Sequence, residues 1–221
     1  QTSDGGYIVC GYTNSFGIGS SDVFLIKTDV NGDTLFTKTF GGSFGDGGNS
    51  VQQTSDGGYI VCGITNSSGN GDGNVYLIKT DASGNILFTR SFGGSGTDVG
   101  YSVHQTNDGG YIVCGYTKSS INSSDIVYLV KTSANGNTIF TKTFGESYGS
   151  EGRSVQQTSD GGYIVCGRFT SAIYLIKTDT NGDTLFTKKF PGINSFYSLV
   201  GRSVQQTSDG GYVIVGYTSS F

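Results

Sequence analysis

The residues that could carry chemistry are few, and most of them stand in turns. Asp29–Asp33 and Asp179–Asp183 read DVNGD and DTNGD, with carboxylate and amide oxygens at every second position, as in calcium loops. Their glycine falls fourth instead of sixth, however, and the equivalent segments 81–85 and 133–137 read DASGN and SANGN, which removes most of the charge. We therefore interpret all four segments as hairpin turns and expect no metal and no cofactor.

A catalytic arrangement is equally hard to find. His104 is the only histidine, and it stands where three other copies of the same segment have glutamine, so it is better read as a substitute for an amide than as a general base. The sequence holds no serine–histidine–acid signature and no phosphate-binding loop. We expect that the protein is not an enzyme.

Charge and hydropathy exclude two further classes of function. The net charge is −4 and the 13 basic residues are spread along the chain, whereas a nucleic-acid surface needs concentrated positive charge. No apolar run approaches the roughly 18–20 residues that span a bilayer. The sequence contains no methionine and begins inside a repeat, so we expect a segment upstream of Gln1. A removed secretion signal is the simplest natural cause, and a shortened chain is the alternative.

The dominant feature of the sequence is an internal repeat. The opening segment QTSDGGYIVCGYT returns four times, and Cys10, Cys62, Cys114 and Cys166 follow one another at intervals of 52 residues. In the last copy Val215 replaces the cysteine. We place the repeat units at about 1–49, 50–101, 102–153 and 154–202, with a partial unit at 203–221, all within one domain of residues 1–221.

Each repeat predicts four short strands, called A to D here. In the second repeat they cover residues 50–54, 58–65, 74–80 and 85–92, which are rich in β-branched and aromatic residues and separated by Asn-Gly or Asp-Gly-Gly turns. A four-stranded antiparallel meander that recurs in this way is the blade of a β-propeller. We therefore predict an all-β fold, a propeller of four or five blades, with an open solenoid or a two-sheet sandwich as the alternative.

The cysteines fit this architecture as packing residues. Equivalent positions in successive blades should lie beyond the roughly 7 Å Cα separation that a disulfide tolerates, so we expect four free thiols. Free cysteine packs as a small apolar side chain, and Val215 at the fifth position has the same character.

The units SDGGYIVCGYTNSFGIGSSDVFLIKTDVNGDTLFTKTFGG and SDGGYIVCGITNSSGNGDGNVYLIKTDASGNILFTRSFGG resemble the β-propeller repeats of secreted and cell-surface proteins of bacteria and archaea. The resemblance covers the whole chain and implies an extracellular or cell-surface location. It says little about activity, since such repeats occur mostly in proteins of unknown function or in adhesive and envelope proteins. The sequence departs from the pattern in strand D, where tryptophan is often found. The residues there are Phe36, Phe88, Phe140 and Phe186.

Counting strands leaves one B strand over. The chain holds B-C-D, then A-B-C-D three times, then A-B, so the A strand at Ser203–Thr207 could complete the first blade, but the B strand at Tyr212–Thr218 then duplicates Tyr7–Thr13. The surplus strand could be displaced, could begin a further blade, or could enter a neighbouring molecule as an open-ended strand exchange. The residues expected to exchange are Tyr212, Val213, Ile214 and Val215.

A second candidate surface is the face that carries the B–C and D–A connections. These connections differ between repeats whereas the A–B and C–D turns are nearly uniform, and binding usually resides in variable loops on a rigid scaffold. The candidate binding residues on this face are Phe44, Tyr101, Tyr148, Arg153, Phe196, Tyr197 and Arg202. Capping the blade ends is the alternative role for the aromatic ones.

Two hypotheses of function follow. The first is a non-catalytic extracellular structural unit that polymerises with itself by terminal strand exchange. The second is an adhesin-like or lectin-like module whose partner is another surface protein or a glycan. An enzyme is the weakest reading, because it needs a polar cluster that the sequence does not show.

Overall fold

The computed structural model describes residues 1–119, 124–145, 149–192 and 199–219. Within these residues the chain forms 17 strands in five sheets, and no segment is helical. The strands fall into two compact units, Gln1–Gln105 and Thr106–Phe221. The all-β prediction is confirmed, and the four-stranded antiparallel sheets are consistent with the blades of a propeller.

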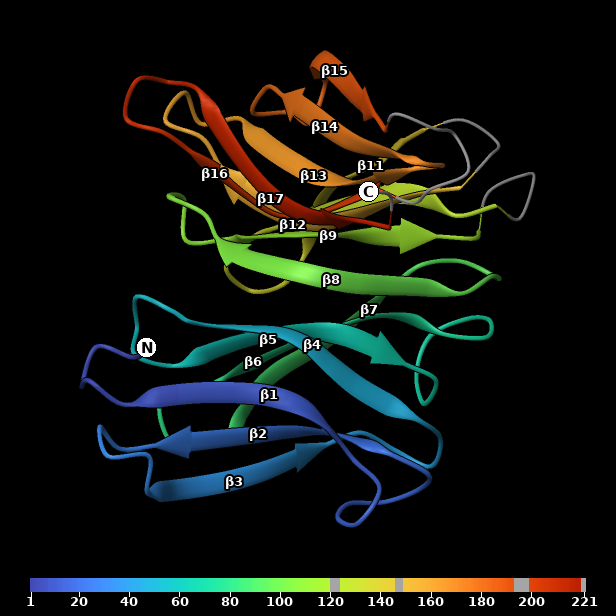
Figure 1. Ribbon diagram of the computed structural model, residues 1–221. Helices are drawn as coiled ribbons and strands as arrows, with labels where there is room; N and C mark the ends of the chain where they lie inside the picture. Colours follow the sequence, from blue (N-terminus) through green and yellow to red (C-terminus); the bar gives the residue numbers. More distant parts are fainter. Residues whose placement is uncertain (120–123, 146–148, 193–198, 220–221) are drawn as a thin grey trace. The chain divides into compact units, whose positions relative to one another are not determined.

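The first unit contains eight strands (Figure 1). They are β1 (Tyr7–Thr13), β2 (Asp22–Thr28), β3 (Thr34–Phe40), β4 (Asp46–Gln53), β5 (Tyr59–Thr65), β6 (Asn74–Thr80), β7 (Ile86–Phe92) and β8 (Asp98–Gln105). The sheet β1-β2-β3 supplies strands B, C and D of the first repeat, and β4-β5-β6-β7 is a complete A-B-C-D meander. Strand β8 is the A strand of the third repeat, and it packs against β4, β5 and β6.

The second unit contains the other nine strands of the described chain. They are β9 (Tyr111–Thr117), β10 (Ile126–Thr132), β11 (Thr138–Phe144), β12 (Ser150–Gln157), β13 (Tyr163–Phe169), β14 (Ala172–Thr178), β15 (Thr184–Pro191), β16 (Leu199–Gln206) and β17 (Tyr212–Thr218). Strand β10 pairs with β9 and β11, the order β12-β13-β14-β15 is a second complete meander, and β16 pairs with β17. All these pairings are antiparallel.

Strand A is longer than the sequence predicts. The sequence places its start at Ser50 in the second repeat, but β4 begins at Asp46 and reaches Ser50 through a register shift between Gly48 and Ser50. The bulge explains the error, because it adds an unpaired residue, Asn49, within a glycine-rich stretch that carries no strand signal. The same shift occurs in β12 and β16.

The A–B hairpin is built around a buried lysine from strand C. In the second repeat the Lys79 ammonium group donates to Asp56 Oδ1 at 3.0 Å and to the carbonyl oxygen of Thr80 at 2.8 Å, and its side chain is only 4% exposed. The backbone nitrogen of Gly58 and the hydroxyl of Thr54 also donate to Asp56 Oδ1. One carboxylate therefore holds the turn and neutralises the lysine.

The two positions Gly57 and Gly58 of this turn require glycine for different reasons. Gly57 has a φ of +82°, in the left-handed region that favours glycine. A Cβ on Gly58 would lie 2.1 Å from the Thr80 carbonyl oxygen and 2.6 Å from Lys79 Nζ, so any side chain there would displace the lysine. The sequence Asp-Gly-Gly is thus required by the lysine as much as by the hairpin.

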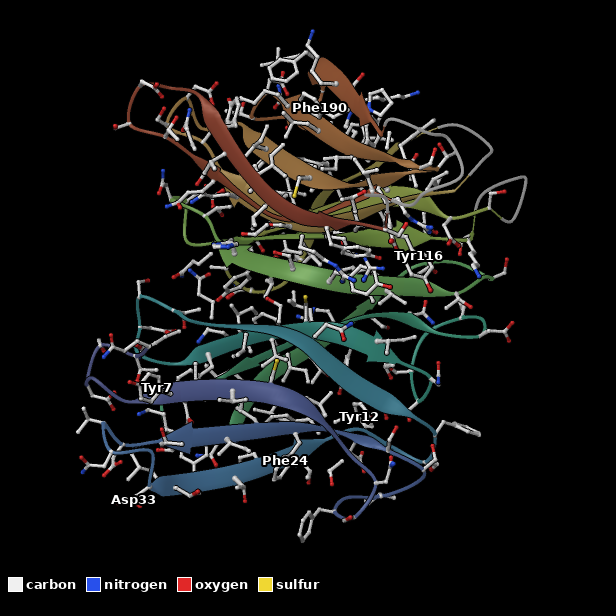
Figure 2. All side chains as sticks on the ribbon, in the orientation of Figure 1. Tyr7, Tyr12, Phe24, Asp33, Tyr116 and Phe190 are labelled. Atoms are coloured by element: carbon white, nitrogen blue, oxygen red, sulfur yellow. The ribbon has the colours of Figure 1, made fainter. Side chains whose placement is uncertain are left out.

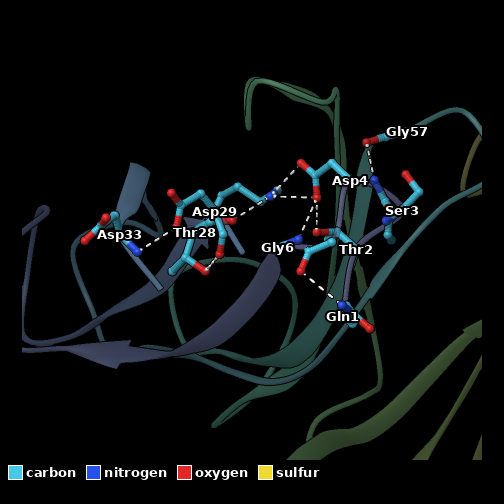
Figure 3. Close-up of polar contacts among 12 residues, drawn as sticks. Gln1, Thr2, Ser3, Asp4, Gly6, Thr28, Asp29, Asp33 and Gly57 are labelled. Atoms are coloured by element: carbon cyan, nitrogen blue, oxygen red, sulfur yellow. Dashed lines mark hydrogen bonds and ion pairs between the residues drawn. The ribbon is translucent and has the colours of Figure 1, made fainter. Parts of the chain in front are cut away.

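This arrangement recurs in four repeats. The aspartate and lysine are 2.8 to 2.9 Å apart in every case; the pairs are Asp4–Lys27, Asp56–Lys79, Asp108–Lys131 and Asp160–Lys177. Figure 3 shows the first copy, with Thr2 and Gly6 around Asp4. Asp209 in the fifth hairpin keeps its bonds from Thr207 and Gly211 but has no lysine partner in the part of the chain that the structure describes.

Hydrogen bonds lower the pKa of these carboxyl groups. Burial alone would raise the pKa of Asp56, but the bonds from Thr54, Lys79 and Gly58 outweigh it and lower the pKa to about 2. In Asp160 the bonds from Thr158 and Lys177 come first, and its pKa is also about 2. A lowered carboxyl pKa means that the interaction stabilises the fold above about pH 4 and is lost as the pH falls through 2.

A glutamine at the end of each A strand connects one repeat to the preceding hairpin. In the first unit the backbone nitrogen of Ser3 donates to Gln53 Oε1 at 2.7 Å, and that of Ser55 donates to Gln105 Oε1 at 2.8 Å. In the second unit Ser159 donates in the same way to Gln206 Oε1. The near identity of the QTSDGG segment in all repeats follows from these contacts.

The cores lie between successive sheets. In the first unit Val23, Leu25 and Phe40 of the first sheet pack against Tyr59 and Val61 of the second. The four cysteines are free thiols, as predicted: Cys62, Cys114 and Cys166 are buried and Cys10 is half-buried. Burial raises the pKa of the Cys10 thiol to about 11 and that of Cys166 to about 12, which suits packing and not redox chemistry.

The contribution of the lysine can be isolated with the same substitution in two equivalent turns. Asp56→Asn removes the charge that faces buried Lys79, and we expect it to lower the free energy of unfolding by about 1 kcal/mol at pH 7, after allowance for the 57% exposure of the Asp56 side chain. Asp209→Asn, in the hairpin without a lysine, should have a clearly smaller effect. Urea denaturation measures both. Equal effects of the two substitutions, or an Asp56→Asn effect that persists near pH 2, would contradict the role of the ion pair.

Candidate functional site

The structure describes four of the seven residues predicted for the binding face. Phe44 lies in the D–A connection as predicted; the residue is 64% exposed, and its backbone nitrogen donates to Ser67 Oγ at 3.0 Å. Tyr148, Phe196 and Tyr197 lie outside the described residues. The remaining three are not in loops.

Tyr101, Arg153 and Arg202 lie inside A strands, which corrects their predicted place in the D–A connections. Tyr101 is in β8, Arg153 in β12 and Arg202 in β16. Arg153 and Arg202 stand between the residues where the register shifts, so each is the extra residue of a bulge. A bulge re-aims side chains and is frequent next to functional sites. Arg153 and Arg202 therefore remain candidate binding residues although they lie in strands.

Arg153 belongs to a charged cluster that the sequence does not reveal. Glu151 of β12 is buried, with 6% of its side chain exposed, and it accepts a hydrogen bond from Arg153 Nη2 at 2.7 Å. Arg168 of β13 is its cross-strand neighbour, with Nε 3.3 Å from Glu151 Oε1. Two guanidinium groups therefore share the Glu151 carboxylate.

The cluster breaks the repeat at two positions. Glu151 stands where the other A strands have Gly47, Val99 and Val200, and Arg168 stands where the other B strands have tyrosine or isoleucine. The signal was visible, since glutamate occurs only at Glu146 and Glu151. The pairing could not be read from the sequence, because it depends on the register of β12 against β13.

The equivalent site at the end of the chain is apolar. In β16 and β17 the cross-strand pair is Val200 and Tyr217, and the Arg202 guanidinium lies 5.3 Å from the centre of the Tyr217 ring. This distance is within the range of a cation–π interaction. At this position the fourth repeat therefore has the Glu151–Arg168 ion pair where the last repeat has Val200 and Tyr217.

His104 lies in β8 and is half-buried. Burial lowers its pKa, so the imidazole is neutral at pH 7 and occupies the place of an uncharged amide. In the neighbouring copy, Gln52 Oε1 accepts a hydrogen bond from the backbone nitrogen of Gln105 at 2.7 Å. The position serves strand-to-strand contacts in that repeat.

The surplus B strand is not displaced. Tyr212 of β17 lies opposite Gln206 of β16, and Tyr212 and Ile214 pack against buried residues of the preceding sheet. Val213 and Val215 point away from that core and are 53% and 63% exposed. The strand therefore has one face and one edge bound, while its other face is bare in the second unit.

The turn Asp29–Asp33 behaves as a hairpin, as predicted. The backbone nitrogens of Asn31 and Asp33 donate to Asp29 Oδ1 at 2.8 and 2.9 Å. This carboxylate oxygen is thus occupied by the turn itself. In the described residues no helix has the length and apolarity needed to cross a bilayer.

Comparison with known proteins gives information on the fold and none on the activity. No family model and no curated protein matches the sequence. A protein of unknown function from Bacteroides caccae aligns over 95% of this chain with a TM-score of 0.59 and 13% identity, and this chain covers 64% of that structure. At such identity the likeness shows a shared fold alone.

Two further structures align less well. The periplasmic gluconolactonase PpgL of Pseudomonas aeruginosa has a TM-score of 0.47 and 11% identity, over 96% of this chain and 76% of that one. The Pan2 WD40 domain of Neurospora crassa has a TM-score of 0.42 and 10% identity, over 90% and 69%. Both scores are too low to support a conclusion about this chain.

The charged cluster can be tested against its apolar counterpart. Glu151→Val leaves Arg153 and Arg168 without their carboxylate and should lower the free energy of unfolding by about 2 kcal/mol, less than the ~3–5 kcal/mol of a fully buried pair because both arginines are partly exposed. The double variant Glu151→Val/Arg168→Tyr recreates the Val200–Tyr217 pair and should recover most of that loss. Chemical denaturation measures both. Failure of the second substitution to compensate would contradict the coupling.

Proposed function

We propose that this chain is a non-catalytic extracellular structural unit that assembles with copies of itself through its two end strands, β1 and β17. The proposal is supported by two bare apolar strand faces, one in each unit, whose counterparts on the interior strands β5 and β13 are buried. The location outside the cell is part of the proposal.

The first bare face is on β17. In the second unit Ile164 and Cys166 of β13 are fully buried, together with Val204 of the following A strand. Val213 and Val215 occupy the same positions on β17, where they are largely exposed. The residue types are equally apolar in both strands, so what β17 lacks in its unit is a following sheet.

The second bare face is on β1. Tyr7 and Val9 are 44% and 50% exposed, whereas Tyr59 and Val61 at the same positions of β5 are 2% and 0% exposed because the preceding sheet covers them. Figure 2 labels Tyr7 near the start of β1. Strand β1 is also an edge of its sheet, so no A strand pairs with it in the described part of the first unit.

The two faces are unlike and complementary in kind. One lacks a following sheet and the other lacks a preceding sheet, and each interior junction within a unit joins surfaces of these two kinds. A contact between unlike surfaces of identical molecules is heterologous, and it gives rings or open filaments. Exposed apolar patches and free sheet edges also favour association.

Exchange of strand β16 is an alternative way of joining one copy to the next, in which β16 leaves β17 and pairs with β1 of another copy. Residues 201–212 read GRSVQQTSDGGY, identical to residues 152–163, and in that earlier copy Ser154 lies opposite Cys166 in the β12–β13 pair. The same register between β16 of one molecule and β1 of another would place Ser203 opposite Cys10. Main-chain hydrogen bonds would then give affinity and the alternating apolar side chains would give specificity.

A cysteine at position 203 tests this exchange directly. In the second unit Ser203 lies opposite Val215, so a cysteine there has no thiol partner while β16 stays with β17. If β16 pairs with β1 of another copy, Ser203→Cys should form a disulfide with Cys10, because cross-strand neighbours lie within disulfide reach. Non-reducing electrophoresis after mild oxidation should show a ladder of oligomers that collapses on reduction.

The control is Ser203→Cys combined with Cys10→Val. Valine occupies this position naturally at Val215, so the control should fold and should give no ladder. Oxidation of Ser203→Cys to a disulfide within one chain, or no disulfide with Cys10 at all, would contradict exchange between copies.

A binding module is the second candidate, and the cluster around Glu151 favours it. Arg153 and Arg168 keep 20% and 33% of their side chains exposed beside the buried Glu151. Arginine pairs suit acidic groups because the guanidinium fork binds carboxylates with two hydrogen bonds. The partner would be a surface protein or a glycan with acidic groups, and a glycan array without any binding would remove the lectin form of this proposal.

A further inference from the structure

Two buried carboxylates meet at the junction between the first two sheets. Asp22 opens β2 and Asp46 opens β4, and they are only 3% and 2% exposed. A Cβ on Gly41 would lie 2.0 Å from Asp22 Oδ1 and 2.7 Å from Asp46 Oδ2, so both carboxylates converge on the space that this glycine leaves open. The three residues belong to the same unit.

The protein supplies little to balance this charge. Asp46 Oδ2 accepts hydrogen bonds from the Gly42 nitrogen at 2.8 Å and from Ser67 Oγ at 2.6 Å, but Asp46 Oδ1 is buried with no hydrogen-bond partner among the residues that the structure describes. In the described residues no lysine, arginine or histidine forms an ion pair with Asp22 or Asp46. Buried charges without a partner are strongly unfavourable, and two like charges side by side are more so.

The equivalent junctions show that this charge is not needed for packing. In the second repeat the pair is Asn74 and Asp98, which converge over Gly93 in the same way. In the third and fourth repeats the pairs are Ile126 with Ser150 and Ala172 with Leu199. The number of carboxylates falls from two to one to none, while the sheets keep the same strand pairings.

The second repeat also shows what surrounds the position of Asp22. Asn74 Nδ2 donates to the carbonyl oxygens of Ser68 and Asn70, at 3.4 and 3.0 Å. The two glycines of the loop before Asp22 have the same conformation as their equivalents: Gly17 and Gly19 have φ values of +105° and +103°, against +101° at both Gly69 and Gly71. Gly17 lies against the Asp22 carboxylate as Gly69 lies against the Asn74 amide.

By this equivalence we expect the carbonyl groups of Phe16 and Ile18 to lie around Asp22 as those of Ser68 and Asn70 lie around Asn74. An amide can donate hydrogen bonds to carbonyl oxygens, but a carboxylate cannot. Two carbonyl oxygens and two carboxylates therefore face one another at the first junction, and the hydrogen bonds that the Gly42 nitrogen and Ser67 Oγ donate there both go to Asp46 Oδ2.

We propose that Asp22 and Asp46, with the carbonyl oxygens of Phe16 and Ile18, form a binding site for a hard divalent cation, of which Ca²⁺ is the best match. The donors are all oxygen, which Ca²⁺ prefers and soft transition metals do not. The ion would join β2 of the first sheet to β4 of the second. This site is distinct from the hairpin turn at Asp29–Asp33, and it revises the sequence-based expectation that the chain binds no metal.

Calcium titration of the chelator-treated full chain tests the site. Isothermal calorimetry with CaCl₂ should show one ion bound per chain, and Ca²⁺ should raise the temperature of thermal unfolding relative to EDTA. Asp22→Asn, which reproduces Asn74, should weaken binding at least tenfold and should abolish the thermal shift. Its circular dichroism in EDTA should match that of the parent, because the same asparagine is already accommodated in the second repeat.

Two more variants make the test specific. Asn74→Asp should raise the stoichiometry to two ions per chain, because it converts the second junction into a copy of the first. Asp33→Asn, in the exposed turn, should leave binding unchanged. Absence of Ca²⁺ binding to the parent chain, binding that survives Asp22→Asn, or binding that is lost with Asp33→Asn would overturn the proposal.

Discussion

Burial of both faces of each sheet by neighbouring copies is the constraint on which the rest of the structure depends. A strand such as β5 carries apolar residues on both sides, so a single meander would leave half of them in water. The preceding sheet covers Tyr59 and Val61, and β8 packs over the same meander from the other side. The core is therefore formed by packing between repeats. The first and last strands, β1 and β17, each keep one apolar face exposed.

The polar parts of the repeat serve the same end. A buried lysine in every strand C would be unfavourable alone, but the aspartate of the A–B hairpin and a backbone carbonyl group satisfy it. The hairpin is in turn tied to the next repeat by a glutamine at the end of strand A. Because turn, lysine and glutamine depend on one another, the QTSDGG segment changes little, whereas positions outside it, such as Glu151, Arg168 and Asp22, differ between repeats.

Local pattern was enough to predict much of this. The strand at 74–80, the Asp29–Asp33 turn and the free cysteines follow from residue types and spacing within a few positions. The features that the sequence did not predict depend on strand register or on contact between sheets. The bulge in strand A brings Arg153 into β12, cross-strand pairing joins Glu151 to Arg168, and contact between sheets brings Asp22 to Asp46. None of these distances is encoded in a single strand.

Sedimentation velocity over a wide range of protein concentration tests the central claim most directly, because bare and complementary end faces should bind one another. The account predicts that the weight-average mass rises with concentration beyond that of a dimer, with no fixed end point, and that charge changes far from β1 and β17 leave this behaviour unaltered. A single species with the mass of one chain, 23.1 kDa, at every concentration would contradict it.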